Sequence, residues 1–421
     1  MKTQDVSRKN GPFRRTLAAL IAAILVGLAL RLTGNAGFIS IADEYILTPV
    51  KTMYLSALKL VVTPVVFFMI SSSVAGISDY KAYGRIGFKI IALYLLTSVI
   101  AICVGLGVAG TLHPGAGVVL DPSVAGYEAD AAEVSLVDTI VSIVPSNLLS
   151  PFLEGEMIQL IFLAVLIGAA SGLLEQRSGI SHFRKGLTLL NQLFLTISSL
   201  VLKLIPVGMF CAVALLVLTI DLGMIMSLLK LIGCVFLGAG IMMCLYGLLF
   251  FLATRKSPLR LLKKCLPNLT SFALLCSTSA VMPQTLDTCT NKLGIDPEIS
   301  SFSMPLGSTM NMDGACIYLT ISALFLAELY GIDLTAGMLV KLGFTTLLLS
   351  VGAPPIPGAG FICLSVLVMQ LGIPMDSIGF LLGIDQLMSM CRTVVNGSGD
   401  FTATAVIACT EGKMDMEIFE Q

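Results

Sequence analysis

The chain has 421 residues, 56% of them hydrophobic and 12% charged, and its mean hydropathy is +0.95. No water-soluble domain of this length is so apolar, so the sequence predicts an all-α polytopic membrane protein. A net charge of −1 gives no general attraction to nucleic acid, and the eleven scattered cysteines form no CxxC or Cys/His metal motif. No Walker motif is present, which argues against ATP as an energy source.

The first 250 residues contain a series of apolar runs. A basic tail, residues 1–16, precedes the first run without an obvious cleavage site, so we expect a retained membrane helix there. Most runs are about 20 residues or longer, enough to cross a bilayer. The run 46–76 suits a long tilted helix, and 134–175 is broken around "VPSNLLSP". The expected membrane segments are 17–32, 46–76, 87–110, 134–175, 187–219 and 224–253.

Lysine and arginine set the expected orientation. Each basic cluster is separated from the next by two crossings, and the loop 111–138 has no Lys or Arg but five acids. The positive-inside rule then places both termini and all clusters in the cytoplasm, in a plasma (inner) membrane. The clusters lie within 2–15, at Lys81/Arg85/Lys89, at Arg177/Arg184/Lys185 and at Arg255/Lys256/Arg260/Lys263/Lys264.

After Lys264 the apolar runs are short and interrupted. "FALLCSTSAVMPQTL" (272–286) breaks at a Ser/Thr run, and the segment 339–374 breaks at "SVGAPPIPGAG". Prolines and glycines there prevent a continuous helix. Irregular backbone at membrane depth is tolerated only when it is buried in protein or lines a cavity. We therefore expect two re-entrant hairpins with facing tips, the second opening as a gate. Two kinked ordinary helices are the alternative.

A third break lies between the two hairpins. The helix 299–330 contains "PLGSTMNMDGA", in which Pro305, Gly307 and Gly314 bracket Asn311 and Asp313. Paired, Gly/Pro-interrupted apolar segments are the best sequence indication of a transporter's midplane binding site.

The last apolar segment has a polar stripe. At 100° per residue, six polar residues fall within about 100° of the helix circumference. This pattern predicts a helix whose stripe faces the hairpin tips. The six are Asp385, Ser389, Arg392, Thr393, Asn396 and Asp400.

The residue types suggest roles. Arg392 offers a planar donor fork for a carboxylate, and Asp385 on the same face can orient it. Asp313 and Asp400 are hard oxygen donors for a small alkali cation. An anion site beside cation sites suggests ion-coupled symport. Structural alternatives are an Arg392–Asp385 ion pair, a helix cap at Asp400 and interhelical hydrogen bonding by Asn311.

Several motifs resemble the glutamate/aspartate and dicarboxylate:cation symporter family. "STSAVMP" and "GAPPIPGAG" are similar to its hairpin tips, "NMDGA" to its NMDGT signature and "MCRTVVNGSGD" to its last helix, with "YLLTS" (94–98) and "IVPSN" (143–147) extending the match. The resemblance implies eight membrane helices and two hairpins in a homotrimer, with an elevator mechanism. The scaffold would comprise 17–76 (helices 1 and 2) and, with an extracellular loop, 111–219. The transport domain would comprise 77–110 and 220–410, followed by a cytoplasmic tail, 411–421.

The resemblance also implies three sodium sites, and their motif positions are intact, which favours sodium over protons. No cofactor is implied. The first site would use carbonyls of Gly307, Asn311 and Asn396 with the Asp400 carboxylate. The second would use main-chain oxygens of Thr309, Ser350, Val351 and Ala353. The third would use Tyr94, Thr97, Ser98, Asn311 and Asp313.

The substrate positions implied by the resemblance are Ser277, Thr278, Ser279, Ile356, Gly360, Ser389, Arg392, Thr393 and Asn396. Two departures matter. The NMDGT threonine is Ala315, and Ser389 stands where amino-acid carriers of the family place an aspartate for the substrate ammonium. An ammonium without a carboxylate partner is poorly bound in a dry site. We therefore expect a dicarboxylate such as succinate, fumarate or malate.

Other functions remain as alternatives at this stage. The same machine could import acidic amino acids, with sodium or protons. "GSGD" (397–400) matches the GxGD of intramembrane aspartyl proteases, but the partner Tyr-Asp is missing because Asp313 follows Met312. A hydrolase is disfavoured because the two histidines, His113 and His182, lie in predicted loops without HExxH. A channel would lack stoichiometric substrate–ion flux. We expect no enzyme.

Overall fold

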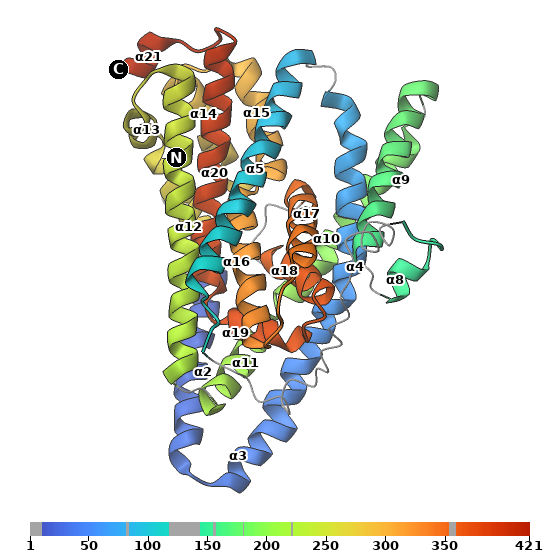
Figure 1. Ribbon diagram of the computed structural model, residues 1–421, viewed down its shortest axis with the longest axis vertical. Helices are drawn as coiled ribbons and strands as arrows, with labels where there is room; N and C mark the ends of the chain where they lie inside the picture. The colour runs from blue at the N-terminus through green and yellow to red at the C-terminus, as the bar shows by residue number, and fades with distance from the viewer. Residues whose placement is uncertain are drawn as a thin grey trace.

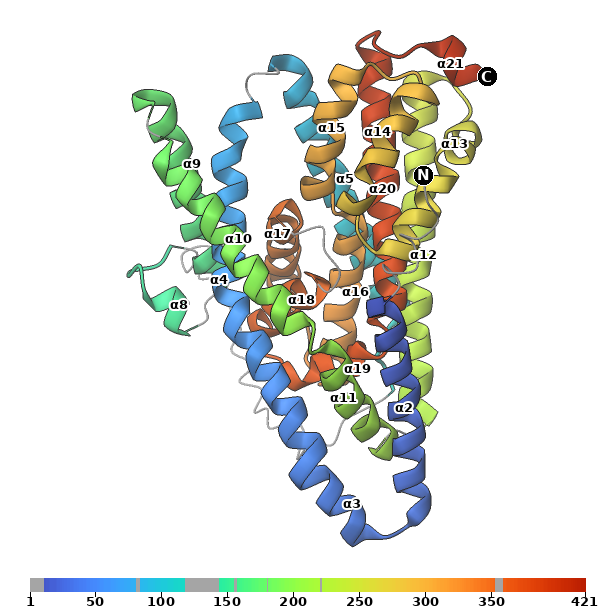
Figure 2. The ribbon, with the colours of Figure 1, turned by 180° about the vertical axis from the view of Figure 1, so that it is seen from behind.

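The computed structural model describes residues 11–80, 84–117, 144–154, 157–179, 181–219, 222–352 and 359–421, and its elements are helical (Figures 1 and 2). One isolated bridge joins Ile295 to Met414. The elements of the first half are α2 (Gly11–Thr33), α3 (Ala36–Ala42), the π-turn η1 (Asp43–Leu47), α4 (Thr48–Tyr80), α5 (Gly84–Leu112), α8 (Ser150–Glu154), α9 (Met157–Ser178), α10 (His182–Leu202) and α11 (Ile205–Thr219). The second half contains α12 (Leu222–Thr254), α13 (Pro258–Leu275), η3 (Ser279–Val281), α14 (Met282–Asn291), α15 (Pro297–Met310), α16 (Asp313–Leu329), α17 (Ala336–Gly352), α18 (Ala359–Gln370), η4 (Met375–Ile378), α19 (Gly379–Leu382), α20 (Asp385–Thr410) and α21 (Met416–Glu420).

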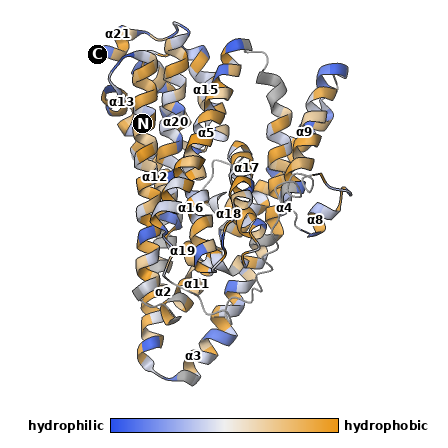
Figure 3. Ribbon diagram, viewed as in Figure 1, coloured by the Kyte–Doolittle hydropathy of each residue, from blue (hydrophilic) through white to orange (hydrophobic). Residues whose placement is uncertain are grey.

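The all-helical membrane fold expected from composition is confirmed. Among the described residues, five helices are long and apolar enough to cross a membrane, and the number is six if α10 and α11, bent by 49°, are counted as one span. Apolar residues dominate the long helices, while hydrophilic residues gather at helix ends (Figure 3). The count of eight helices plus two hairpins stays a prediction, and the expected segment 134–175 lies partly outside the described residues.

The helices form two sets of contacts. In the first, α4 packs against α9, α10 and α11, and α11 packs against α2. In the second, α20 lies among α12, α13, α15, α16 and α5. The first set comes from 17–76 and 111–219, so the predicted scaffold segments do contact one another. Their assignment to a static scaffold, and of the second set to a moving domain, stays a prediction.

Three helix ends that contain or precede basic residues lie together. The first turn of α5, the last turn of α9 and the last turn of α12 are at the same end of the molecule as the C-terminus (Figures 1 and 2). Those turns include Arg85 and Arg177, and Arg255 follows α12 directly. This arrangement supports the cytoplasmic assignment of that end, which remains a prediction.

All three expected breaks are helix ends. Helix α13 stops at Leu275, Cys276 takes a left-handed conformation (φ 48°), and the chain continues through η3 into α14, which contacts α13. Helix α17 stops at Gly352 and α18 begins at Ala359, so most of the second tip lies outside the described residues.

The third break separates α15 from α16 at Asn311 and Met312, whose ψ angles of 74° and 46° are not helical. Helix α15 starts with Pro297 after the cap Asp296, whose carboxylate accepts from Glu298 N, an arrangement that favours a helix start. Unwinding at Asn311 releases backbone groups inside the protein, where other residues must satisfy them.

Candidate functional site

The polar stripe of α20 faces the protein interior. Its six residues are each at most 8% exposed, and Asp400 is 2% exposed. Burying such groups is expensive unless they are paired or serve a ligand. Helix α20 is therefore amphipathic with its polar side toward protein, as its sequence predicts.

Arg392 lies at the centre of this stripe. Its Nη2 donates to the Ser389 hydroxyl at 2.8 Å, and its Cζ lies 5.1 Å from the centre of the Tyr318 ring. Its Nη1 has no hydrogen-bond partner among the described residues. A guanidinium held by a ring face and one hydroxyl keeps donors available for an anionic ligand.

Ser389 stands between Arg392 and Asp385. The Ser389 hydroxyl accepts from Arg392 and donates to Asp385 Oδ2 at 3.3 Å. The sequence predicts that Asp385 can orient the guanidinium, and in the structure Ser389 makes the link between the two side chains. Asp385 Oδ1 has no hydrogen-bond partner among the described residues. Thr393, on the same stripe, donates to the Ser389 carbonyl at 2.7 Å, which satisfies its hydroxyl within the helix.

Gly360, in the first turn of α18, lies against Arg392. A Cβ added there would lie 1.8 Å from Arg392 Nη1. Only a residue without a side chain allows this approach of the second hairpin to the guanidinium. The other expected position on this hairpin, Ile356, lies outside the described residues.

The first hairpin tip reaches the same region in part. Thr278 is buried and its hydroxyl lies 3.5 Å from the Ser308 carbonyl, next to the unwound turn. The Ser277 hydroxyl accepts from Ala280 N at 3.3 Å, and Ser279 is exposed at the start of η3. Gln386 Nε2 donates to Cys276 Sγ at 3.2 Å, which joins this tip to α20.

The residues of the first expected sodium site meet at the unwound turn. Asn311 Nδ2 donates to Asp400 Oδ1 at 3.0 Å. A Cβ on Gly307 would lie 2.4 Å from that same oxygen, so the missing side chain brings the carboxylate to the backbone. Asn396 Oδ1 accepts from Gly314 N at 2.7 Å, and its Nδ2 donates to Met312 Sδ. These contacts fix α20 against both sides of the break.

The residues of the third expected sodium site also cluster. Thr97 donates to the Tyr94 carbonyl at 3.0 Å and to Asn311 Oδ1 at 3.1 Å, and Ser98 donates to Asp313 Oδ1 at 2.7 Å. The Tyr94 hydroxyl instead contacts Ser303, 2.8 Å from its hydroxyl. Carboxylate, amide, hydroxyl and carbonyl oxygens gather here, which is the donor chemistry that hard cations prefer.

The second expected sodium site is described only in part. Val351 packs against the apolar cluster that includes Leu306 and Met310, and α17 contacts α15, the helix that contains Thr309. The hydroxyls of Ser350 and Thr309 donate to carbonyls of their own helices. The groups expected to bind the ion are the main-chain oxygens of these two residues. Ala353 lies outside the described residues.

Sequence reasoning missed two tyrosines. The Tyr246 hydroxyl, from α12, donates to Asp313 Oδ2 at 2.6 Å, and Tyr318 lies under Arg392. Both are buried in otherwise apolar helices. A buried tyrosine hydroxyl usually needs a partner, which was the available signal, but periodicity does not say which helix supplies it.

An intramembrane site of broken helices, with a buried arginine and two buried aspartates, is the arrangement of a secondary transporter. The profile of the sodium:dicarboxylate symporter family matches residues 13–410, so the chain belongs to that family of multi-pass membrane transporters and is not an enzyme.

Similar proteins span nearly the whole chain. A C4-dicarboxylate transport protein of Rhodospirillum rubrum is 30% identical over 96% of this chain and 89% of its own length. One from Burkholderia cenocepacia is 31% identical over 98% and 96%. A proton/sodium-glutamate symport protein of Bacillus subtilis is 30% identical over 95% and 94%.

Proposed function

We propose that the protein imports a C4-dicarboxylate such as succinate, fumarate or malate together with sodium ions. The observation that supports this best is the pairing of Arg392, which has a free Nη1, with Ser389 instead of a carboxylate. The arginine matches one substrate carboxylate, and the uncharged serine beside it does not repel the second. The names of the Rhodospirillum and Burkholderia relatives agree with this substrate class.

Sodium coupling is supported by the oxygen-rich clusters around the broken helix. Asp400 and Asp313 are buried, and each is surrounded by neutral hydrogen-bonding groups, with no cation bonded to either among the described residues. A bound sodium ion would balance a charge that is otherwise expensive at this depth. We propose all three sodium sets for this role, with Asp400 and Asp313 supplying the carboxylates.

The remaining features of the proposal concern assembly and movement. The chain would form a homotrimer in the plasma membrane with both termini in the cytoplasm. The helices of 77–110 and 220–410 would move as an elevator against the scaffold. The second hairpin would close over bound substrate. The contact of Gly360 with Arg392 supports this, because it places the hairpin beside the proposed substrate arginine.

Acidic amino acids are the second candidate substrate class. Asp385 Oδ1 is buried and has no hydrogen-bond partner among the described residues, so it could receive a substrate ammonium. The Bacillus relative is named for glutamate. Dicarboxylates are favoured because Ser389, not Asp385, contacts the arginine.

The deciding experiment is uptake of labelled succinate and labelled aspartate into proteoliposomes, with a sodium gradient, a proton gradient or neither. The proposal expects sodium-driven uptake in which succinate outcompetes aspartate. Preference for aspartate would show that the substrate is an acidic amino acid and not a dicarboxylate. Equal uptake under a proton gradient without sodium would show that sodium is not the coupling ion.

A further inference from the structure

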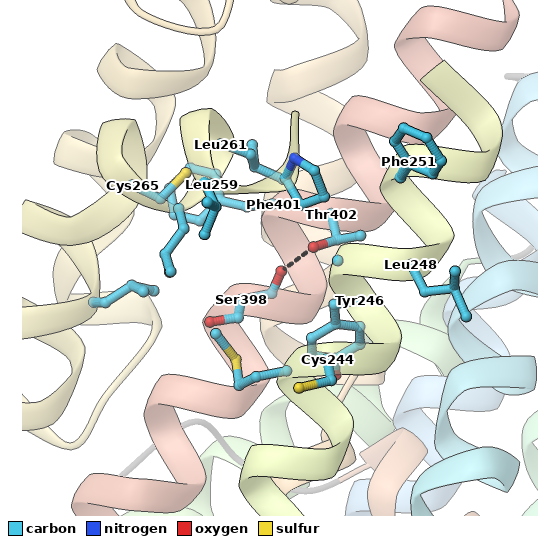
Figure 4. A pocket seen from close by; sticks show the side chains of 15 residues that line it. Cys244, Tyr246, Leu248, Phe251, Leu259, Leu261, Cys265, Ser398, Phe401 and Thr402 are labelled. Atoms are coloured by element: carbon cyan, nitrogen blue, oxygen red, sulfur yellow. Dashed lines mark hydrogen bonds between the residues drawn. The ribbon is translucent and has the colours of Figure 1, made fainter. Parts of the chain in front are cut away.

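A cavity lies on the far side of α20 from the polar stripe. It occupies about 530 Å³ between α12, α13 and α20 (Figure 4). Its volume falls within the range of small-molecule sites. Its walls include Met243, Gly247, Phe251, Leu261, Phe401 and Thr402.

In the described part of the chain, the side-chain hydroxyls that line the cavity are all satisfied, and the thiols of Cys244 and Cys265 are only weak hydrogen-bond donors. The hydroxyls that line it, Ser398 and Thr402, donate to carbonyls of their own helix at 2.7 and 2.8 Å. The Tyr246 hydroxyl donates to Asp313. A ligand there therefore gains mainly apolar contact, as an acyl chain does.

The rim of the cavity is apolar and exposed on the outer surface. Leu248, Phe251, Leu259 and Leu262 line the cavity and are each at least 39% exposed. In a membrane protein such a surface faces lipid, so the cavity is open to acyl chains.

The chain segment beside this rim is rich in cations. The segment 255–264, which follows α12 and begins α13, has five cations. Lys256 pairs with Glu420, and Lys264 donates to the carbonyls of Lys292 and Ile418. The other three, Arg255, Arg260 and Lys263, are exposed. Glu420, which also lies near Arg260, balances only part of this charge.

We propose that this cavity binds one acyl chain of an anionic phospholipid, whose headgroup meets Arg255, Arg260 and Lys263. Cations next to an apolar site between membrane helices are typical of anionic-lipid recognition. The same segment supplies Pro258, Leu259, Leu261 and Leu262 to the wall, so chain and headgroup are recognised side by side. The proposal requires only that the chain spans a membrane and is independent of the transported substrate.

The test uses the full protein in nanodiscs with a diazirine-tagged phosphatidylglycerol or phosphatidylcholine at equal amounts. Labelled peptides are mapped by mass spectrometry. One cation near an anionic headgroup contributes on the order of fivefold in binding, so phosphatidylglycerol should label α12 and α13 at least about fivefold more strongly. Equal labelling by the two lipids would overturn the headgroup assignment.

Gly247→Leu places a side chain in the cavity. Its Cβ would lie 3.4 Å from Pro258, an ordinary contact, so we expect the helix to persist while labelling of the cavity falls about fivefold or more. Gly240→Leu is the matched control, because nothing lies within 4 Å of its Cβ on the same helix. Loss of labelling in both variants, or in neither, would contradict the proposal that the acyl chain binds in this cavity.

Replacing Arg255, Arg260 and Lys263 together by Gln tests the headgroup at exposed positions where folding is not at stake. The preference for phosphatidylglycerol should disappear while labelling by phosphatidylcholine persists. Lys230→Gln, exposed near the other end of α12, should leave the preference unchanged. A preference that survives the triple substitution would refute the proposal.

Discussion

Two long membrane segments of nearly equal length differ in how much of each is buried inside the protein. Gly223–Thr254 in α12 is one continuous helix, and 33% of its most apolar stretch is buried. Pro297–Leu329 is broken at Asn311, and 94% of the corresponding stretch is buried. The apolar helix forms the outside, and the broken one lies inside.

The difference follows from hydrogen bonding in a medium without water. Helix α12 satisfies its backbone internally and can face lipid. The unwound turn between α15 and α16 exposes backbone groups and lies beside Asp313, so it must be surrounded by protein and by α20. If substrate and sodium binding are confined to this inner region, a substitution there should impair binding, and a comparable substitution in α12 should not.

The largest effect is expected from Arg392→Ala. Succinate affinity should fall by about 10²-fold or more, because leaving one half of a buried charge pair costs about 3–5 kcal/mol. Calorimetric titration with succinate in the presence of sodium measures this affinity. Lys230→Ala, an exposed charge on α12, is the control and should change nothing. Unchanged affinity in the Arg392 variant would remove this residue from the substrate site.

Asp400→Asn should act on the ion. Removing a buried carboxylate from the unwound turn should raise the sodium needed for half-maximal succinate binding by about 50-fold, since the two binding free energies are linked. A sodium titration of succinate binding tests this. Asp287→Asn, on an exposed carboxylate that bonds Asn291, should behave as wild type. A sodium curve that does not shift would exclude Asp400 as an ion ligand.

Gly360→Ala should disturb the substrate site without unfolding the protein. The new Cβ would overlap the end of a flexible arginine, so the guanidinium moves and succinate affinity falls about tenfold. Gly240→Ala on α12 should have no effect on affinity. If the Gly360 variant retains full affinity at unchanged thermal stability, the second hairpin does not position Arg392.

Ser389→Asp should change selectivity. Charges about 4 Å apart at an effective dielectric near 20 interact by about 4 kcal/mol, so an added carboxylate repels a dicarboxylate and attracts an ammonium. The ratio of aspartate to succinate uptake should rise about tenfold or more. Ser389→Ala, which adds no charge, should not raise it. If Ser389→Asp leaves the ratio of aspartate to succinate uptake unaltered, Asp385 remains the candidate partner for a substrate ammonium.

The smallest effect is expected just after the end of α20. Glu411 bonds Lys89 and Arg85, and these hydrogen bonds hold the pKa of its carboxyl below its usual value. A lowered folded-state pKa stabilises the protein above the unfolded-state pKa, about 4.3, and this stabilisation is lost as pH falls through the folded value.

Glu411→Gln should therefore lower the unfolding temperature slightly at pH 7, with a difference that shrinks at pH 4 and below. Thermal unfolding in nanodiscs at both pH values measures it, with Glu417→Gln as the control. A difference that grows on acidification would contradict the ion-pair explanation.

The sequence by itself determined that the fold is built of apolar helices, where the three breaks fall and the polar stripe on α20. Each of these is local: an apolar run long enough to span, a Pro/Gly interruption, or a 100° rotation per residue places the feature on its own segment. Asn311 could be assigned to an unwound turn, with Asp313 close behind it, for this reason.

Only the tertiary structure decided which groups meet across helices. Tyr246 reaches Asp313 across 67 residues of sequence, Tyr318 lies under Arg392, and Ser389 stands between Arg392 and Asp385. The cavity behind α20 also forms only where three helices pack. Periodicity fixes the direction of a side chain from its own axis, but the partner it meets depends on how neighbouring helices pack, and several apolar helices would satisfy the same pattern.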